Sequence, residues 1–100
     1  MAKLNGPEIL ERLPNAKGWE SHGDMLVRSW QFPSFRRALE FLGQVGSIAE
    51  KADHYPDMVL SYRTVRLELS THAEGGVTEQ DFLFASEVNT LPDAQPTTLT

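Results

Sequence analysis

The stretch 35–52, FRRALEFLGQVGSIAEKA, most constrains the fold, because its apolar residues recur with the 3.6-residue period of a helix. They fall at positions 35, 38, 39, 42, 45, 49 and 52. Ser34 is suited to cap the start of this helix, and Pro56 disfavours helical backbone at Tyr55, so the helix should end near His54. A helix of about five turns with one apolar stripe must pack that stripe against the rest of the chain.

Before this helix, the sequence predicts a short helix and a β-hairpin. The short helix begins at Pro7, with Asn5 or Gly6 as its cap, and stops at Pro14. Two strands then pair around a turn at 23–24. In the second of these strands, Met25, Val27 and Ser29 face opposite to Leu26, Arg28 and Trp30.

After the long helix, the sequence predicts a second hairpin and a last helix. The hairpin covers 57–72 with a turn near Arg63-Thr64, and places Val65, Leu67 and Leu69 on one face. A glycine turn follows, and Thr78 caps a helix with apolar Phe82, Leu83, Ala85 and Val88. This order of elements favours an α+β fold, a four-stranded antiparallel sheet with helices packed on it.

Composition narrows the class of protein. The length of 100 residues indicates one domain, which we place at 1–91, followed by a tail at 92–100 predicted to be flexible. A net charge of -5, with nine scattered Lys and Arg, argues against nucleic-acid binding. No apolar run has the length of a signal peptide or a membrane span, so we expect a cytoplasmic protein without membrane contact. A domain of this size buries only about two thirds of its unfolded surface, so a homo-oligomer is a natural expectation.

Titratable residues distant in the sequence should meet at one end of this fold. A hairpin of two similar strands returns to its starting point, so His72 should lie near 54–57. The glycine turn then begins the last helix close by, with Asp81 in its first turn. Glu50 and His54 come from the end of the long helix. Two imidazoles beside two carboxylates are suited to moving protons, so this end of the fold predicts acid/base chemistry.

Each of these residues also has a purely structural explanation. His54 would favour a helix C-terminus, Asp81 could close a capping box with Thr78, and Glu50 could pair with His54 four residues away. His72 could be an exposed loop histidine. A metal site of His54, His72 and Asp81 is a further alternative, weakened by the lack of a short-range ligand pair. Trp19, His22, Trp30 and Tyr62 are assigned by default to packing or to a hairpin edge.

The joint spacing of these residues resembles the signature of the pterin-4a-carbinolamine dehydratases. Glu50 is followed by KAD, then His54, Tyr55 and Pro56. Tyr62, His72 and Asp81 follow at set distances. The resemblance covers roughly 19–91 and implies a four-stranded antiparallel sheet with three helices on one face. It also implies removal of water from a 4a-hydroxytetrahydropterin, which gives a quinonoid dihydropterin and supports tetrahydrobiopterin recycling, with no metal and no organic cofactor.

The resemblance assigns roles to individual residues. His54 and His72 would act as general acids on the departing hydroxyl, one for each face of the pterin, oriented by Asp81 and Glu50. The substrate-binding set would be Glu50, Tyr55, Pro56, Ser70 and Thr71. Two positions depart from the family pattern, since Tyr55 stands where a second His is usual and Met58 replaces a Trp of some members. The phenol of Tyr55 should alter affinity for the pterin more than the chemistry.

A protein-binding module of the same fold is the rival interpretation. The resemblance includes members that serve as partners of other proteins, such as a dimerisation cofactor of a transcription factor and assembly factors that have lost catalytic residues. The presence of both His54 and His72 favours the enzyme, and Tyr55 points the other way. As an enzyme the chain would bind a small pterin and form a homodimer or homotetramer.

Overall fold

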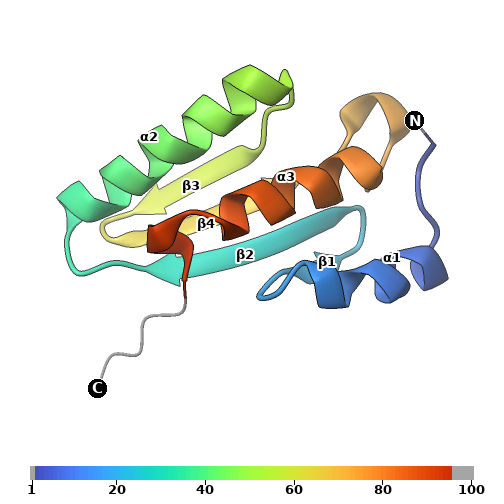
Figure 1. The fold of residues 1–100 in the computed structure, drawn as a ribbon, viewed down its shortest axis with the longest axis horizontal. Helices are drawn as coiled ribbons and strands as arrows, with labels where there is room; N and C mark the ends of the chain where they lie inside the picture. The colour runs from blue at the N-terminus through green and yellow to red at the C-terminus, as the bar shows by residue number, and fades with distance from the viewer. Residues whose placement is uncertain (1, 96–100) are drawn as a thin grey trace.

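A computed structural model of the protein describes residues 2–95, and it confirms the α+β fold. Three helices and four strands follow one another as α1 (Gly6–Arg12), β1 (Glu20–His22), β2 (Met25–Gln31), α2 (Phe35–Ala52), β3 (Asp57–Ser61), β4 (Thr64–Leu69) and α3 (Glu79–Asn89). The strands form one antiparallel sheet in the order β1-β2-β4-β3, and α2 and α3 run roughly along the direction of the strands (Figure 1). The predicted flexible tail lies largely outside the described residues, although Pro92–Ala94 forms a short 3-10 helix, η3.

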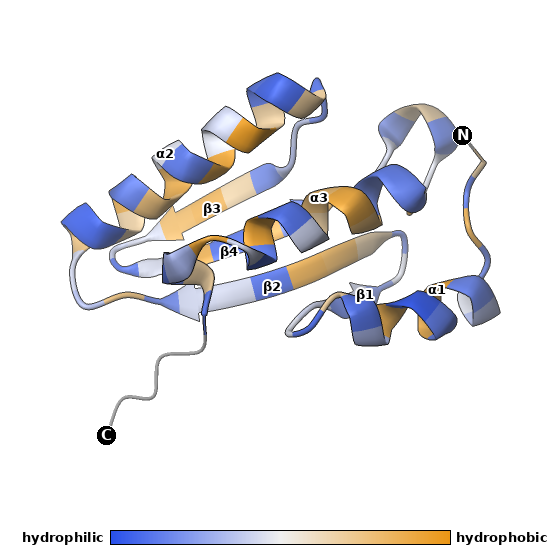
Figure 2. Ribbon diagram, in the orientation of Figure 1, coloured by the Kyte–Doolittle hydropathy of each residue, from blue (hydrophilic) through white to orange (hydrophobic). Residues whose placement is uncertain are grey.

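The core lies between one face of the sheet and the helices. In the register of β2 and β4, Leu26 pairs with Leu69 and Trp30 with Val65, and all four side chains are buried. The helix α2 supplies Ala38, Phe41, Val45 and Ala49, spaced by three or four residues, which confirms the helical period. Ala38, Val45 and Ala49 belong to the predicted stripe, whereas Phe41 does not. Figure 2 shows the apolar side of α2 turned toward the sheet and its polar side turned away. Burial of this stripe is what fixes α2 on the sheet.

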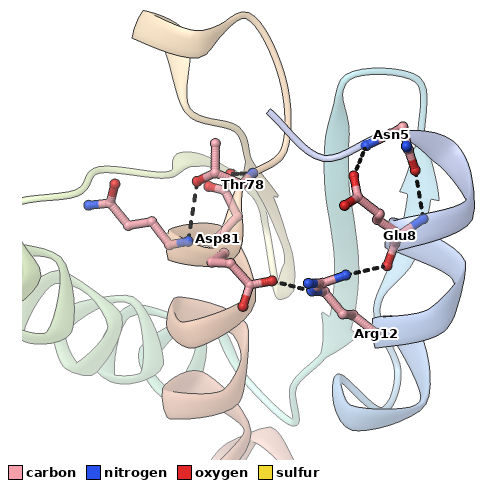
Figure 3. Close-up of polar contacts among 7 residues, drawn as sticks. Asn5, Glu8, Arg12, Thr78 and Asp81 are labelled. Carbon is pink, nitrogen blue, oxygen red and sulfur yellow. Dashed lines mark hydrogen bonds and ion pairs between the residues drawn. The ribbon is translucent and has the colours of Figure 1, made fainter. Parts of the chain in front are cut away.

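The helix starts follow the capping residues of the sequence. Asn5 and Glu8 close a capping box at α1, with hydrogen bonds of 2.9 and 2.8 Å, and Ser34 accepts from the Arg37 backbone at α2. Arg12 then ties α1 to the first turn of α3 through an ion pair with Glu79 (Figure 3). The Arg12–Glu79 pair therefore joins α1 to the end of α3 at which the candidate site lies.

Some local predictions need correction. The turn between β3 and β4, expected near Arg63-Thr64, consists of Tyr62 and Arg63, one residue earlier, because strand pairing continues to Ser61 and Thr64. Tyr62 takes a left-handed φ of 55° and is 70% exposed, so it is not a packing residue. The strand β4 ends at Leu69, short of His72.

Part of the predicted apolar pattern does not reach the core. Phe35 and Leu39 are each 47% exposed, and Leu83 on α3 is 65% exposed. Position on a helical period tells which side chains share a face, but the width of the buried stripe depends on what packs against it. Within residues 2–95, no helix is both long and apolar enough to cross a bilayer.

Candidate active site

The end of α2 turns His54 toward the core. Asp53 ends the helix in the left-handed conformation with φ 51°, one of the few non-glycine residues that tolerates it. The Asp53 and His54 backbone N–H groups both donate to the Ala49 carbonyl, the latter at 3.2 Å. Such paired bonds are typical of a helix end that reverses direction. His54 therefore leaves the helix axis and is only 8% exposed.

The end of β4 brings Thr71 to the same place. After Leu69 the chain makes a single bridge between Thr71 and Gly76, closing a small loop around the 3-10 helix η2 (His72–Glu74). Gly75 has a φ of 75°, which allows this tight return. The loop leads directly into the Thr78 cap of α3, so Thr71 and the first turn of α3 are adjacent.

Asp81 is the centre of the site. Its side chain is fully buried and accepts three hydrogen bonds, from the segment after α2, the segment after β4 and the cap of α3. His54 Nε2 lies 2.6 Å from Oδ1, while Thr71 Oγ1 and the Thr78 backbone N–H each donate to Oδ2 at 2.9 Å. Thr78 also bonds Thr71 through their hydroxyls at 2.8 Å, so the network is continuous. Both carboxylate oxygens are occupied, which fixes the carboxylate plane relative to the imidazole.

The geometry leaves the other ring nitrogen of His54 for solvent or a ligand. No residue between 2 and 95 forms a hydrogen bond with His54 Nδ1. In the same residues, every buried polar side-chain atom has a hydrogen-bond partner, so an atom without a partner must be exposed. Nδ1 therefore reaches the surface, while the ring packs edge-on against Phe84 at a centroid distance of 6.0 Å. A carboxylate on one nitrogen and an open second nitrogen are the arrangement that lets an imidazole give or take a proton.

Tyr55 and Glu50 form a second pair beside this dyad. The phenol donates to Glu50 Oε2 at 3.0 Å, and both side chains are on the surface. That hydrogen bond raises the pKa of Tyr55 above its ordinary value, with smaller contributions from burial and from the negative charges of Glu50 and Asp53. The Tyr55 phenol is therefore protonated and neutral at neutral pH. Tyr55 directly follows His54 in the chain.

The remaining predicted residues are close in the chain to members of these two pairs. Pro56, two residues after His54, and Ser70, directly before Thr71, are half-buried. His72 follows Thr71 directly but its side chain is exposed. The structure therefore joins His54, Thr71 and Asp81 by direct contact, and places His72 next to them in the chain without a hydrogen bond to Asp81.

Thr78 belongs to the site although the sequence suggested only a cap. Its backbone N–H donates a hydrogen bond to Asp81 Oδ2, and its hydroxyl forms a hydrogen bond with the Thr71 hydroxyl. The signal was present in the spacing of Thr78 and Asp81, since a capping box requires the acidic side chain to turn back toward the cap. Figure 3 shows Thr78 and Asp81 together at the start of α3.

A metal centre is not built from these residues. Among residues 2–95 there is no group of three His, Asp or Glu side chains close enough together to hold an ion. The His54 and Asp81 side chains instead bond to one another, and they are 9% and 0% exposed.

The structure is thus a small α+β domain with three helices and a four-stranded sheet, and it carries a buried carboxylate–imidazole pair where the ends of α2 and β4 meet the start of α3. The family model described as pterin 4 alpha carbinolamine dehydratase matches residues 2–91. The chain belongs to this family of enzymes.

Individual relatives agree with this assignment. A protein of Sulfolobus acidocaldarius is 42% identical over 87 residues, covering 87% of this chain and 96% of the relative. One of Thermomicrobium roseum is 42% identical over 88 residues, covering 88% and 95%. Both have provisional names as pterin-4-alpha-carbinolamine dehydratases.

Two solved structures share the fold. The crystal structure of a transcriptional coactivator/pterin dehydratase from Brucella melitensis has a TM-score of 0.83 and 36% identity, covering 88% of this chain and 96% of that one. A pterin dehydratase-like protein, identified as a RuBisCO assembly factor in the alpha-carboxysome, has a TM-score of 0.64. At 20% identity, over 76% of this chain and 90% of that one, the second likeness concerns the fold alone.

Proposed function

We propose that the protein dehydrates a 4a-hydroxytetrahydropterin to the quinonoid dihydropterin. Family membership supports the substrate class, and the 2.6 Å contact between His54 Nε2 and the buried Asp81 carboxylate carries the proposal. In the reaction the bond between C4a and the hydroxyl oxygen breaks, and the departing hydroxyl takes a proton and leaves as water. A proton leaves the adjacent ring nitrogen, whose electron pair forms the new double bond. No oxidant, reductant or organic cofactor is needed for this balance.

His54 is the proposed general acid, acting through the exposed Nδ1. Asp81 holds Nε2–H and stabilises the positive charge of the protonated ring, so the proton to be given sits on the solvent-facing nitrogen. His72, one residue beyond Thr71, is the proposed second acid or base on the other face of the pterin. The two rings would line one hollow the size of a pterin.

Substrate contacts are proposed for the residues around the dyad. Glu50 and Tyr55 offer an acceptor and a neutral hydroxyl beside His54, while Ser70 and Thr71 offer groups to the polar edge of the ring. Pro56 would form part of the wall. Because Tyr55 stands in place of a second histidine, Tyr55→His should preserve or improve turnover, with its effect mainly on KM. A sharp fall in kcat would show that Tyr55 has another role.

The three histidines of the chain provide a direct test. Dehydration of a 4a-hydroxytetrahydropterin is followed by stopped-flow absorbance, with a chelator present, for the parent protein and single variants. His54→Ala and His72→Ala should each lower the rate by about 10²- to 10⁴-fold, the usual contribution of a positioned acid. His22→Ala is the control, because His22 is an exposed residue of β1 paired with Glu20. A parent rate at the background level would refute the enzyme and favour the protein-binding module.

We also propose that the chain forms a homodimer or homotetramer. The strand β3 is an edge of the sheet, and its Met58 and Val59 are 39% and 48% exposed. Figure 2 shows β3 as largely apolar. An open edge with apolar side chains and no Lys or Pro is suited to pairing with another strand. Sedimentation should give a mass of two or four chains, and Val59→Lys should reduce it; a parent protein that sediments as a monomer would contradict this.

A further inference from the structure

A cavity lined by charged and amide side chains as well as apolar groups lies at the opposite end of α3 from the dyad. It has a volume of about 370 Å³, and its lining includes Lys17, Gly18, Arg28, Asn89 and Gln95. Asn89 and Asp81 are both on α3, eight residues apart, which is about 12 Å along a helix. None of the residues assigned to pterin binding or proton transfer lines this cavity. Its chemistry is therefore independent of the proposed dehydration.

Arg28 places a partly buried positive charge in the lining of this cavity. It lies on β2 opposite Leu67, on the sheet face that otherwise carries apolar side chains such as Leu26 and Trp30. Its guanidinium carbon lies 4.7 Å from the centroid of the Trp30 ring. Burial lowers the pKa of Arg28 from its ordinary value, so its charge is less well solvated here than in water.

The hydrogen bonds of Arg28 fix its position but leave its charge unbalanced. Nη1 donates to the Lys17 carbonyl at 3.0 Å and to Asn89 Oδ1 at 2.6 Å, and Nη2 donates to the Ala94 carbonyl at 2.7 Å. All three acceptors are neutral. No carboxylate between residues 2 and 95 forms an ion pair with Arg28, although a partly buried charge is normally paired.

Two of the five N–H donors of the guanidinium, Nε–H and one Nη2–H, remain without a partner among residues 2–95. Arg28 Nε has no hydrogen-bond partner in the described chain, and no polar side-chain atom there is both buried and unbonded, so Nε–H reaches solvent. Gly18 makes this opening possible. It has a φ of 86°, and a Cβ on it would come within 2.7 Å of both Nε and the guanidinium carbon. A larger residue would therefore displace or cover the free edge of the guanidinium.

The other residues that line the cavity add a second positive charge. Lys17 is exposed and forms no ion pair with any residue of the described segment. No Asp or Glu of residues 2–95 lines the cavity, whereas two cations and the amides of Asn15, Asn89 and Gln95 do. Two positive charges beside a cavity of ligand size, with no carboxylate of residues 2–95 in its lining, form a site that favours a negatively charged group.

We propose that this cavity, lined by Lys17 and Arg28, is a binding site for a small organic anion bearing a carboxylate or phosphate group. The anion accepts hydrogen bonds from Arg28 Nε and from the Lys17 ammonium. Its negative charge balances the positive charge of Arg28. The volume exceeds that of a bare oxyanion, so a small organic body fits beside the charged group.

Amide chemical-shift titrations test the site with three probes: benzoate, inorganic phosphate and benzyl alcohol. Both anions should shift the amides of Lys17, Gly18 and Asn89 at millimolar concentration, and benzyl alcohol, which has the same ring without the charge, should not. The amides around His54 and Asp81 should not move. Absence of anion-dependent shifts at Gly18 and Asn89, or equal shifts with benzyl alcohol, would overturn the proposal.

Variants separate this site from a purely structural role of Arg28. Arg28→Gln should abolish anion binding, provided its amide spectrum shows a folded protein. Lys17→Gln changes only an exposed side chain and should weaken binding about two- to fivefold, the range of an exposed charge contact, while Lys17→Glu should abolish it. His54→Ala should bind the anion like the parent. Unchanged affinity in Lys17→Glu would refute the site even if Arg28→Gln does not fold.

Discussion

Replacing Asp81 by Asn separates the structural role of this residue from its proposed chemical role. The change keeps the shape of the side chain but leaves one acceptor oxygen where the carboxylate had two. His54 Nε2–H, Thr71 O–H and the Thr78 N–H converge on it at 2.6, 2.9 and 2.9 Å. The Thr78 N–H is a backbone donor and cannot reverse. The amide should therefore turn its oxygen toward Thr78 and its NH₂ toward His54.

This orientation has two measurable consequences. His54 must accept at Nε2 and carry its neutral-state proton on Nδ1, a tautomer change visible in imidazole ¹⁵N shifts. The protonated ring loses its carboxylate, so the dehydration rate should fall about 10²- to 10⁴-fold. Hydrogen bonds to a charged group contribute about 1.5–3 kcal/mol each. We expect Asp81→Asn to cost about 2 kcal/mol, which lowers the Tm of a domain of this size by roughly 10 °C.

The matched control is Glu79→Gln, two residues earlier in the same helical turn. Glu79 pairs with Arg12 at the surface, with side-chain exposures of 47% and 30%, so its loss should change stability by at most about 1 kcal/mol. Its dehydration rate should equal that of the parent. A folded Asp81→Asn protein with the parent rate would refute the dyad and leave Asp81 as a helix cap.

Two further predictions concern Tyr55 and the glycines. Because the pKa of Tyr55 is raised in the folded state, its contribution to stability is present below the pKa of an unfolded tyrosine, about 10, and is lost as pH rises through the higher folded value. In Tyr62→Phe, which leaves Tyr55 as the single phenol, absorbance titration should show this raised pKa, and adding Glu50→Gln should lower it. Gly18→Ala should destabilise by about 1–3 kcal/mol, since φ is 86° and a side chain contacts the new Cβ; Gly43→Ala, in open space on α2, should stabilise by about 0.5–1 kcal/mol in thermal melts.

The parts of the fold that depend on local rules were predictable. The stripe of α2, the capping residues Asn5, Ser34 and Thr78, and the alternation of β4 each follow from neighbours within a few residues. The meeting of His54 with Asp81 also followed, because antiparallel pairing determines where a hairpin returns.

Features that depend on distant contacts were not predictable. Alternation put Arg28 on the apolar face of β2, but the three oxygens that hold it come from a loop, the end of α3 and η3. The left-handed turn at Tyr62 had no glycine or asparagine to announce it. Exposure of Phe35 and Leu39 depends on what lies beside α2, which periodicity does not specify.

The structural and chemical interpretations of Asp81 are compatible, because its two oxygens do different things. Oδ2 closes the capping box of α3 and holds Thr71, and Oδ1 is directed at His54. A carboxylate fixed by its helix does not have to reorganise when the imidazole becomes charged, and fixed partners are what make electrostatic stabilisation effective. The capping box of α3 therefore fixes the orientation of the Asp81 carboxylate, and this carboxylate orients the His54 ring. The spacing of Thr78 and Asp81 is then required for the position of the dyad as well as for the start of the helix.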